Sequence, residues 1–351
     1  MTDKEWAGLL SFLNEKPGAY VPAGLIVDSP WIPGYCRVDT VDYYGDPKVW
    51  LDCQDQVRAD FPGLLFLPGD WVEFGMASEP SSFGCPVHFF HDQTVGIGHL
   101  ITSADDLDEL DDLPVPDPRR DGLMPLALSK IRLLRGELAE RGRRLRIVAA
   151  RGPLNVAGFL MTIPEFCVAV KTDPERVHRL LDKTTELVIR WLEAQAEAAG
   201  EIGGILLLDD ICGFFSEEEY LEFAHPRLKR IFEHFSVPVK MFHNDNFGNR
   251  YTTFPHIADL GVNLFNFSYQ AQLGEASGLL GPKVAILGNL PPLDLLTRGT
   301  PEEIGAAVRA QLAERPADCR LMLSAGGGAS PGMPKENLKA MLEALAACQP
   351  G

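Results

Sequence analysis

From about residue 140 onward, the chain alternates between short apolar segments and longer amphipathic ones. The apolar segments that we interpret as strands are 145–150, 205–209, 239–243, 264–267, 284–289 and 320–324. Such alternation is typical of parallel strands covered by helices. The first third of the chain has room for two further strands, including one at 64–67. We therefore predict an α/β fold, a (β/α)8 TIM barrel. A dinucleotide-binding sheet is disfavoured because no Gly-x-Gly-x-x-Gly motif follows any strand.

Capping signals locate several of the covering helices. Pro174 in a first turn predicts a helix that runs to Ala199, and capping boxes at 216–219 and 300–303 open two more. The last helix is expected over 335–347. The chain has 351 residues, a length that barrels of this kind reach as one domain. We expect a single barrel domain, with residues 1–60 forming an N-terminal extension that packs on the barrel.

The composition excludes several functional classes. The formal net charge is −17, whereas nucleic-acid binding requires a basic surface, so no nucleic-acid partner is expected. The sequence has no run of about 18 apolar residues, and its first residues lack the features of a signal peptide. A cytoplasmic protein without a membrane partner is the default expectation. The seven cysteines are scattered without a Cys-x-x-Cys pair, which indicates reduced thiols.

Polar residues follow nearly every predicted strand. In TIM barrels the catalytic groups lie at the carboxyl ends of the strands, where they converge on one mouth. The residues in question are Asp70 and Glu73, Arg151 and Asn155, Asp209 and Asp210, 243–246, Asn266 with Ser268 and Tyr269, Asn289, and Ser324 with 326–328. Because Asp209 and Asp210 are adjacent carboxylates, we expect one of them to be functional, with its pKa raised by the like charge of its neighbour.

The segment Phe242-His243-Asn244-Asp245 is the most informative of these strand ends. Residues two apart in an extended segment point the same way, so His243 and Asp245 could bind one ligand together. An imidazole with a carboxylate suits Zn²⁺ or a similar divalent ion. Two alternatives stay open. His243 could act as a general acid/base or substrate contact, or the residues could have a purely structural role in a turn.

The run Gly326-Gly327-Gly328 follows the last predicted strand. A flexible glycine loop can expose backbone N–H groups to an anion or a substrate. The alternative is a plain turn that needs positive φ. The loop is not a P-loop, because no Gly-Lys-Ser/Thr follows.

Taken together in their order and spacing, several segments resemble the uroporphyrinogen decarboxylase superfamily, which includes zinc- and corrinoid-dependent methyltransferases. The resemblance extends from about Leu64 to Ala347. It is carried by 65–70, Glu79 with 83–84, 151–153 with 159–160, 208–213, 242–245, 287–292, and 327–328 with Pro331, Pro334 and 336–337. The resemblance implies a (β/α)8 barrel, in agreement with the alternation of strands and helices.

The chain departs from the decarboxylase pattern in four places. Residues 28–35 lack the arginines that hold substrate carboxylates, and Phe159 or a neighbour stands at the position of a tyrosine. Asp209-Asp210 replaces an Asp-Ser pair, and a glycine within 326–328 replaces a histidine. The departures argue against a porphyrinogen substrate, which would be strongly acidic like the protein itself.

The methyltransferase branch carries His-x-Cys where this chain has 243–245, and a second cysteine where Ala325 or Gly326 stands. The resemblance therefore implies a histidine–carboxylate site in place of a thiolate zinc site. Such a site would be completed by a further carboxylate, namely Asp70, Glu73 or Asp209.

The function that the resemblance implies is methyl transfer from a small O- or N-methylated substrate to a corrinoid carrier. The alternatives are a decarboxylase-like lyase acting on a small carboxylic acid and a non-catalytic ligand-binding barrel. The expected site has catalytic His243, Asp209 and Asp70, substrate contacts from Asp210, Asn289, Tyr269, Phe159 and Gly327, and a divalent metal such as zinc on His243 and Asp245. The expected partners are the substrate and a corrinoid protein, and a homodimer is left open.

Overall fold

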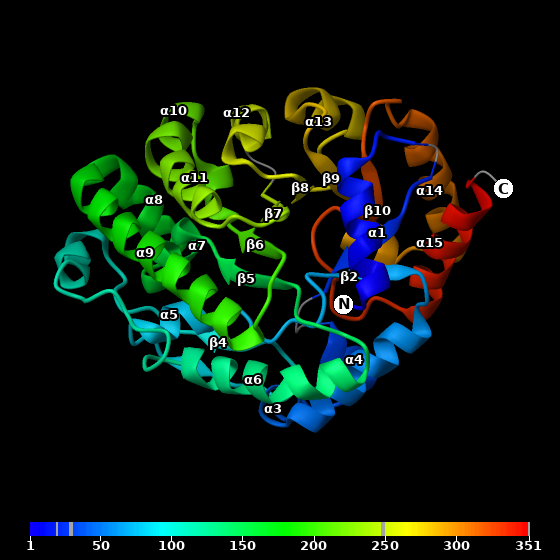
Figure 1. Ribbon diagram of the computed structural model, residues 1–351. Helices are drawn as coiled ribbons and strands as arrows, with labels where there is room; N and C mark the ends of the chain where they lie inside the picture. The colour runs from blue at the N-terminus through cyan, green and yellow to red at the C-terminus, as the bar shows by residue number, and fades with distance from the viewer. Residues whose placement is uncertain (19, 28–30, 247–249, 350–351) are drawn as a thin grey trace.

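The computed structural model describes residues 1–18, 20–27, 31–246 and 250–349. Eight parallel strands form one sheet in the order β2-β1-β10-β9-β8-β7-β6-β5. Their bounds are β1 Ala23–Ile26, β2 Leu64–Leu67, β5 Ile147–Arg151, β6 Gly204–Leu208, β7 Val239–Asn244, β8 Leu264–Phe267, β9 Ala285–Leu290 and β10 Leu321–Ala325. The sheet curls, and helices surround its outer side (Figure 1). The predicted α/β, TIM-barrel-like fold is confirmed, including all six strands expected after residue 140.

The helices predicted over 174–199 and 335–347 are formed with these bounds, as α9 and α15. The covering helices are α1 Asp3–Asn14, α2 Ile32–Cys36, α3 Thr40–Gly45, α4 Pro47–Asp60, α5 Ser78–Ser82, α6 Met124–Glu140, α7 Pro153–Leu160, α8 Ile163–Thr172, α9 Pro174–Ala199, α10 Glu217–Glu219, α11 His225–His234, α12 Arg250–Ile257, α13 Leu273–Leu280, α14 Pro301–Glu314 and α15 Lys335–Ala347. Both predicted capping boxes are formed, at Ser216 before α10 and at Thr300 before α14. Among the described residues no single helix is long and apolar enough to cross a membrane, although α7 and α8, bent by 104°, meet that criterion together.

Short elements connect these helices and strands. An antiparallel ribbon pairs β3 Val87–His88 with β4 Gly96–Ile97. Helical turns of the 3-10 type span Ala104–Leu110, Ile211–Phe214 and Ala258–Leu260, and π-helical turns span Tyr220–Ala224 and Pro292–Thr297. The π-helical turn after α10 continues directly into α11, so the helix expected from the first capping box is formed with a change of pitch.

Alternate residues of the strands belong to two different cores. One set of alternate side chains forms an inner apolar cluster inside the curled sheet. Its members on β5 to β10 are Ile147, Ala149, Leu206, Leu208, Val239, Met241, Leu264, Ala285, Leu287 and Met322. The intervening strand residues pack with the helices in the outer cluster. Because successive strand residues point to opposite faces, the next inward positions beyond this apolar layer include Asp210, His243 and Asn266. The strands therefore deliver polar side chains to the carboxyl end of the barrel.

β2 and β5 stand at the two ends of the strand order, and side chains bind the edge of β5. The backbone N–H of Arg151 donates to Oε1 of Glu79 at 2.8 Å. Nε2 of Gln195 donates to the carbonyl oxygen of Ala149 at 2.9 Å. These bonds satisfy backbone groups that an edge strand would otherwise leave unpaired.

One correction concerns residues 1–60, which were expected to form an extension packed on the barrel. The structure places β1 inside the sheet, where Ala23 is paired with Leu64 of β2 and Leu323 of β10. The strand has only four residues, and because Ala23 and Gly24 are small, no clear apolar run marked it in the sequence. The preceding helix α1 crosses the barrel in Figure 1 and adds Leu9 and Leu13 to the inner cluster.

Candidate active site at the mouth of the barrel

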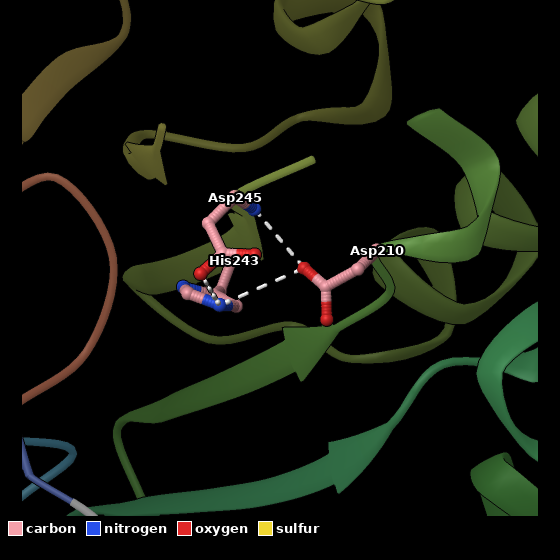
Figure 2. A group of neighbouring side chains, drawn as sticks. All are labelled: Asp210, His243 and Asp245. Atoms are coloured by element: carbon pink, nitrogen blue, oxygen red, sulfur yellow. Dashed lines mark hydrogen bonds and ion pairs between the residues drawn. The ribbon is translucent and has the colours of Figure 1, made fainter. Parts of the chain in front are cut away.

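Three polar side chains from neighbouring strands meet at the carboxyl end of the sheet (Figure 2). His243 lies on β7, Asp245 follows that strand, and Asp210 follows β6. Nε2 of His243 lies 3.6 Å from Oδ1 of Asp210 and 4.0 Å from Oδ2 of Asp245. The backbone N–H of Asp245 also donates to Oδ1 of Asp210 at 3.0 Å. One ligand atom from each residue lies within 4.8 Å of the others, so the three side chains could hold a metal ion.

Asn266 on β8 determines which nitrogen of the His243 ring is free. Its Oδ1 lies 2.7 Å from Nδ1 of His243, while its Nδ2 donates to the carbonyl oxygens of Leu287 at 2.6 Å and Ala325 at 3.0 Å. Because both amide hydrogens of Asn266 are committed, Oδ1 accepts and Nδ1 of His243 carries the hydrogen. In its neutral form the ring presents the lone pair of Nε2 to the two carboxylates. An outer hydrogen-bond acceptor of this kind usually accompanies a metal-binding histidine.

The adjacent carboxylates Asp209 and Asp210 point to different sides of the sheet. Asp209 is fully buried and accepts the backbone N–H groups of Leu154 at 3.0 Å and Asn155 at 3.1 Å, in the first turn of α7. A Cβ at Gly152 would lie 2.2 Å from Oδ2 of Asp209, so only glycine fits at that position. The catalytic role expected for Asp209 therefore finds no support in its contacts, because its carboxylate caps a helix.

Burial raises the pKa of Asp209 well above its ordinary range. The negative charge of Asp210 adds to this rise, whereas the two backbone N–H donors oppose it. The sequence-based expectation of a raised pKa in this pair is thus met at Asp209, and the dominant cause is desolvation and not the neighbouring charge.

Asn155 is a site residue to which sequence reasoning assigned no role. Its Oδ1 accepts the backbone N–H groups of Asp210 and Ile211, both at 3.0 Å. Its Nδ2 donates to the carbonyl oxygen of Leu208 at 3.2 Å and to Oδ2 of Asp210 at 3.4 Å. These bonds hold the turn that carries Asp210. The position of Asn155 after a strand was visible in the sequence, but its partner 55 residues away was not.

Asp245 is half-exposed, with 49% of its side chain accessible. The burial of the rest is the main cause that raises its pKa above the ordinary range. The neighbouring Asp210 raises the pKa further, whereas His243 opposes the rise. Two close carboxylates beside one imidazole therefore favour a proton or a cation between them.

Glycines and polar residues from the last two barrel strands border this cluster. Gly327 has a φ of 124°, and a Cβ there would lie 3.2 Å from Oδ2 of Asp245. At Gly326 a Cβ would lie 2.3 Å from Oδ1 of Asn289 and 2.5 Å from the backbone N of Tyr269. The structure thus places the predicted contacts Gly327, Asn289 and Tyr269 along one rim.

Asn289 on β9 and Ser324 on β10 are direct neighbours in the sheet register. Nδ2 of Asn289 donates to the carbonyl oxygen of Ala271 at 2.6 Å. Oδ1 of Asn289 and Oγ of Ser324 are buried without a hydrogen-bond partner among the described residues. Unpaired buried polar atoms are rare in native proteins and often bind a water or a ligand. Ser324 is therefore a candidate contact to which sequence reasoning gave no role.

Asp70 lies in a buried ion cluster apart from His243. Its carboxylate binds Nη2 of Arg58 at 3.5 Å, Nη1 of Arg143 at 3.1 Å and the α-amino group of Met1 at 2.9 Å. Burial alone would raise the pKa of Asp70, but these cations hold it below the ordinary value. Gly69, with a φ of 114°, turns the chain immediately before it. Asp70 does follow a strand, as the sequence indicated, but its contacts are structural.

Phe159 also lies away from the cluster in its described contacts. It is a half-buried residue of α7. Its carbonyl oxygen lies 3.1 Å from Nδ1 of His99 and accepts a weak bond from Sγ of Cys85 at 3.8 Å. These contacts give no support to the substrate role that the family resemblance implied.

A curled sheet of eight parallel strands with polar groups at its carboxyl ends defines a TIM-barrel-like protein whose site lies where such barrels carry catalytic residues. The chain belongs to the uroporphyrinogen decarboxylase (URO-D) family, whose family model matches residues 38–348. The resemblance inferred from the sequence is confirmed. Similar proteins in this family are enzymes, named as decarboxylases or as a methyltransferase.

Three relatives illustrate the range of names. A methylated-thiol–coenzyme M methyltransferase of Methanosarcina mazei is 27% identical over 281 residues, which are 78% of this chain and 70% of that protein. The uroporphyrinogen decarboxylase of Alkalilimnicola ehrlichii is 28% identical to this chain, over 76% of this chain and 72% of that protein. The uroporphyrinogen decarboxylase of Vesicomyosocius okutanii is 30% identical, over 49% of each protein. The match to the last therefore spans only about half of that protein. A solved methyltransferase from Methanosarcina mazei has a TM-score of 0.78 at 20% identity, with 97% of both chains covered, and supports the fold.

Proposed function

We propose that this protein transfers a methyl group from a small O- or N-methylated substrate to a corrinoid carrier, with a divalent metal ion held by Asp210, His243 and Asp245. The observation that supports this proposal most strongly is the orientation of the His243 ring. Asn266 binds Nδ1, so Nε2 is left to face the two carboxylates. The relative named methylated-thiol–coenzyme M methyltransferase supports methyl transfer as the class of reaction.

The three side chains fit a divalent metal ion in chemistry and in spacing. Neighbouring ligands of a tetrahedral zinc site, each about 2.1 Å from the ion, are about 3.4 Å apart. The distances of 3.6 and 4.0 Å from Nε2 to the carboxylate oxygens are close to this value. Three protein ligands also leave one position open for a substrate atom. A bound ion would supply a Lewis acid that stabilises the leaving heteroatom.

The surrounding residues have complementary roles in this proposal. Asn266 keeps the His243 ring in one tautomer and one orientation. The raised pKa of Asp245 in the metal-free protein means that a proton competes with the ion for this carboxylate, so metal binding should strengthen as the pH rises. The unpaired atoms of Asn289 and Ser324 would contact polar groups of the substrate.

The charge of the mouth disfavours the decarboxylase-like alternative. A substrate rich in carboxylates would meet Asp210 and Asp245 in a chain of net charge −17. The strand-end arginine, Arg151, is already bound, with Nη2 at 3.5 Å from Glu73 and 3.3 Å from the carbonyl oxygen of Gly75. A neutral methylated donor, whose heteroatom has a lone pair that can face the bound ion, suits this environment better.

The test combines the purified protein with cob(I)alamin and a panel of methyl ethers and methylamines, extended to methyl thioethers because of the relative's name. We expect the absorption spectrum of methylcobalamin with at least one donor, and stoichiometric zinc, manganese or iron by elemental analysis. His243→Ala should lower the rate by about 100-fold or more. His256→Ala is the matched control, because His256 lies on α12 and contacts Glu217 at 2.9 Å. Carbon dioxide release from small acids, without methylcobalamin from any donor, would instead support a lyase.

A further inference from the structure

A cavity of about 560 Å³ lies at the other end of the barrel, between α1 and the beginnings of β1, β2 and β10. Its volume is in the range of small-molecule binding sites. Leu9 and Phe12 of α1, Leu65 of β2 and Met322 of β10 give it an apolar lining. The cavity is separate from the mouth that carries His243, because its strand residues come from the amino ends of the strands.

The lining of this cavity carries an excess of positive charge. Its charged residues are Lys4, Lys16, Arg315, Arg320, Glu5 and Glu15. Glu5 is engaged elsewhere, because its Oε1 binds Nη1 of Arg58 at 3.0 Å and its Oε2 accepts the backbone N–H of Thr2 at 2.7 Å. In a chain with a net charge of −17, a cavity lined by four cations and two anions is a local exception.

The two arginines of this cavity bind only neutral partners among the described residues. Nη2 of Arg320 donates to the carbonyl oxygen of Glu15 at 2.8 Å, and Nη2 of Arg315 donates to that of Gly18 at 2.9 Å. Nε of Arg320 is buried without a hydrogen-bond partner in the described part of the chain. Because no carboxylate of the described residues balances either guanidinium charge, an anion in the cavity would gain charge-assisted contacts with both arginines.

We propose that this cavity binds a small anionic amphiphile, an aliphatic or aromatic body that carries one carboxylate or sulfonate. The apolar body would contact Phe12, Leu65 and Met322, and the anionic group would lie against Arg320 and Arg315. The site is independent of methyl transfer, because its residues and the His243 cluster occupy opposite ends of the barrel.

The probe for this site is 8-anilinonaphthalene-1-sulfonate, titrated into the full chain and followed by its fluorescence. We expect saturable binding with one equivalent of probe. Decanoate should displace the probe, whereas decyltrimethylammonium, which has the same chain and the opposite charge, should not. Absence of saturable binding, or equal displacement by the cation, would overturn the proposal.

Two variants locate the probe in the cavity. Gly8 on α1 lines it, and a Cβ there meets no atom within 4 Å, so Gly8→Leu fills the space while favouring the helix. This variant should abolish binding. Gly136→Leu is its matched control, because Gly136 also lies in a helix with open space around it, but outside the cavity. Unchanged binding by Gly8→Leu would refute the location.

Charge is tested separately. Arg320→Gln should weaken binding of the probe by about tenfold, the effect of losing one charge-assisted hydrogen bond. Arg132→Gln on the exposed surface of α6 makes the same change in net charge outside the cavity and should bind as the wild type does. If Arg320→Gln folds poorly by circular dichroism, the paired change Lys4→Gln with Lys16→Gln replaces it, because both lysines are exposed. Equal affinity of the charge variant and Arg132→Gln would contradict the anionic class.

Discussion

Oδ1 of Asn266 lies 2.7 Å from Nδ1 of His243, and the two residues are direct partners in the register of β7 and β8. The amide hydrogens of Asn266 are committed to carbonyl oxygens on the far side, so its oxygen can only face the ring. The register of β7 and β8 therefore determines that Nε2, and not Nδ1, is the ring nitrogen of His243 that faces the two carboxylates. Asn266 is a positioning residue, since it acts on the two carboxylates through the ring.

The first prediction concerns this positioning. Asn266→Leu removes the acceptor and should weaken zinc binding by about 10- to 100-fold, the usual effect of losing such a partner. Asn266→Asp restores an acceptor for Nδ1 but not the two donors, so it should regain zinc affinity while remaining less stable than the wild type. The measurement is a competition titration of Zn²⁺ against a chelator, beside urea unfolding.

Asn263 offers the matched control, at the opposite end of the same strand. Its Oδ1 accepts the backbone N–H of Lys240 at 2.9 Å and its Nδ2 donates to the carbonyl oxygen of Pro238 at 2.7 Å. Asn263→Ala should therefore lower the free energy of unfolding and leave zinc affinity unchanged. Wild-type zinc affinity in Asn266→Leu would show that the ring is oriented by something else.

The sequence predicts the relative placement of two residues where the period of a strand decides it. His243 and Asp245 lie two apart, and the structure brings both within reach of one ion. The same argument could not tell which of Asp209 and Asp210 faces inward, because the strand before them is apolar on both faces and the sequence does not show which face is the inner one. The partners of Asp209 are N–H groups on α7, about 55 residues away, and no local pattern reveals them.

Other parts of the fold were out of reach for similar reasons. Asp70 follows a strand as expected, yet its role is decided by Arg58 and Arg143, and these contacts form only in the folded chain. β1 was missed as a barrel strand because two of its four residues, Ala23 and Gly24, are small and have low strand propensity. The longer strands and the capped helices, by contrast, carry their own local signals, and they were placed within a few residues.

The second prediction separates the adjacent carboxylates. Asp209→Ala leaves the backbone N–H groups of Leu154 and Asn155 unpaired in a buried place, and should lower the free energy of unfolding by about 2 kcal/mol. Zinc affinity should change little. Asp210→Ala should do the reverse, with zinc affinity lower by about tenfold or more and a smaller loss of stability. Urea unfolding and zinc titration of both variants test the contrast, and an identical pattern in the two would contradict it.

The third prediction uses the pKa of Asp209, which burial raises in the folded protein above its ordinary value. Below the ordinary value of about 4, both the folded and the unfolded chain hold this proton, and its contribution to stability is fully present. As the pH rises toward the raised pKa, the unfolded chain loses the proton first, and stability falls by about 1.4 kcal/mol for each pKa unit of separation.

Asp209→Asn cannot titrate, so its free energy of unfolding should improve relative to that of the wild type as the pH rises from about 4 to 8. Urea unfolding of both proteins across this range measures the difference, and any constant cost of the amide cancels in the slope. A difference that stays the same at every pH would show that the folded protein holds Asp209 at an ordinary pKa.

The fourth prediction concerns the glycine that borders the cluster. Gly327 has a φ of 124°, where a side chain is strained by about 1–3 kcal/mol, and a Cβ there would press on Oδ2 of Asp245 at 3.2 Å. Gly327→Ala should therefore lower stability and also displace the Asp245 carboxylate, weakening zinc binding by about tenfold. Gly332 has a φ of 78°, but a Cβ there meets nothing within 4 Å.

Gly332→Ala thus carries backbone strain without the contact, and it should lower stability while leaving zinc affinity as in the wild type. Comparing the two variants by urea unfolding and zinc titration separates strain in the backbone from displacement of a ligand. If both variants lose zinc affinity in proportion to stability, then the loss comes from general loosening of the barrel mouth. A loss confined to Gly327→Ala would instead establish that the Asp245 carboxylate takes part in binding the ion, because that carboxylate is what the added methyl group meets.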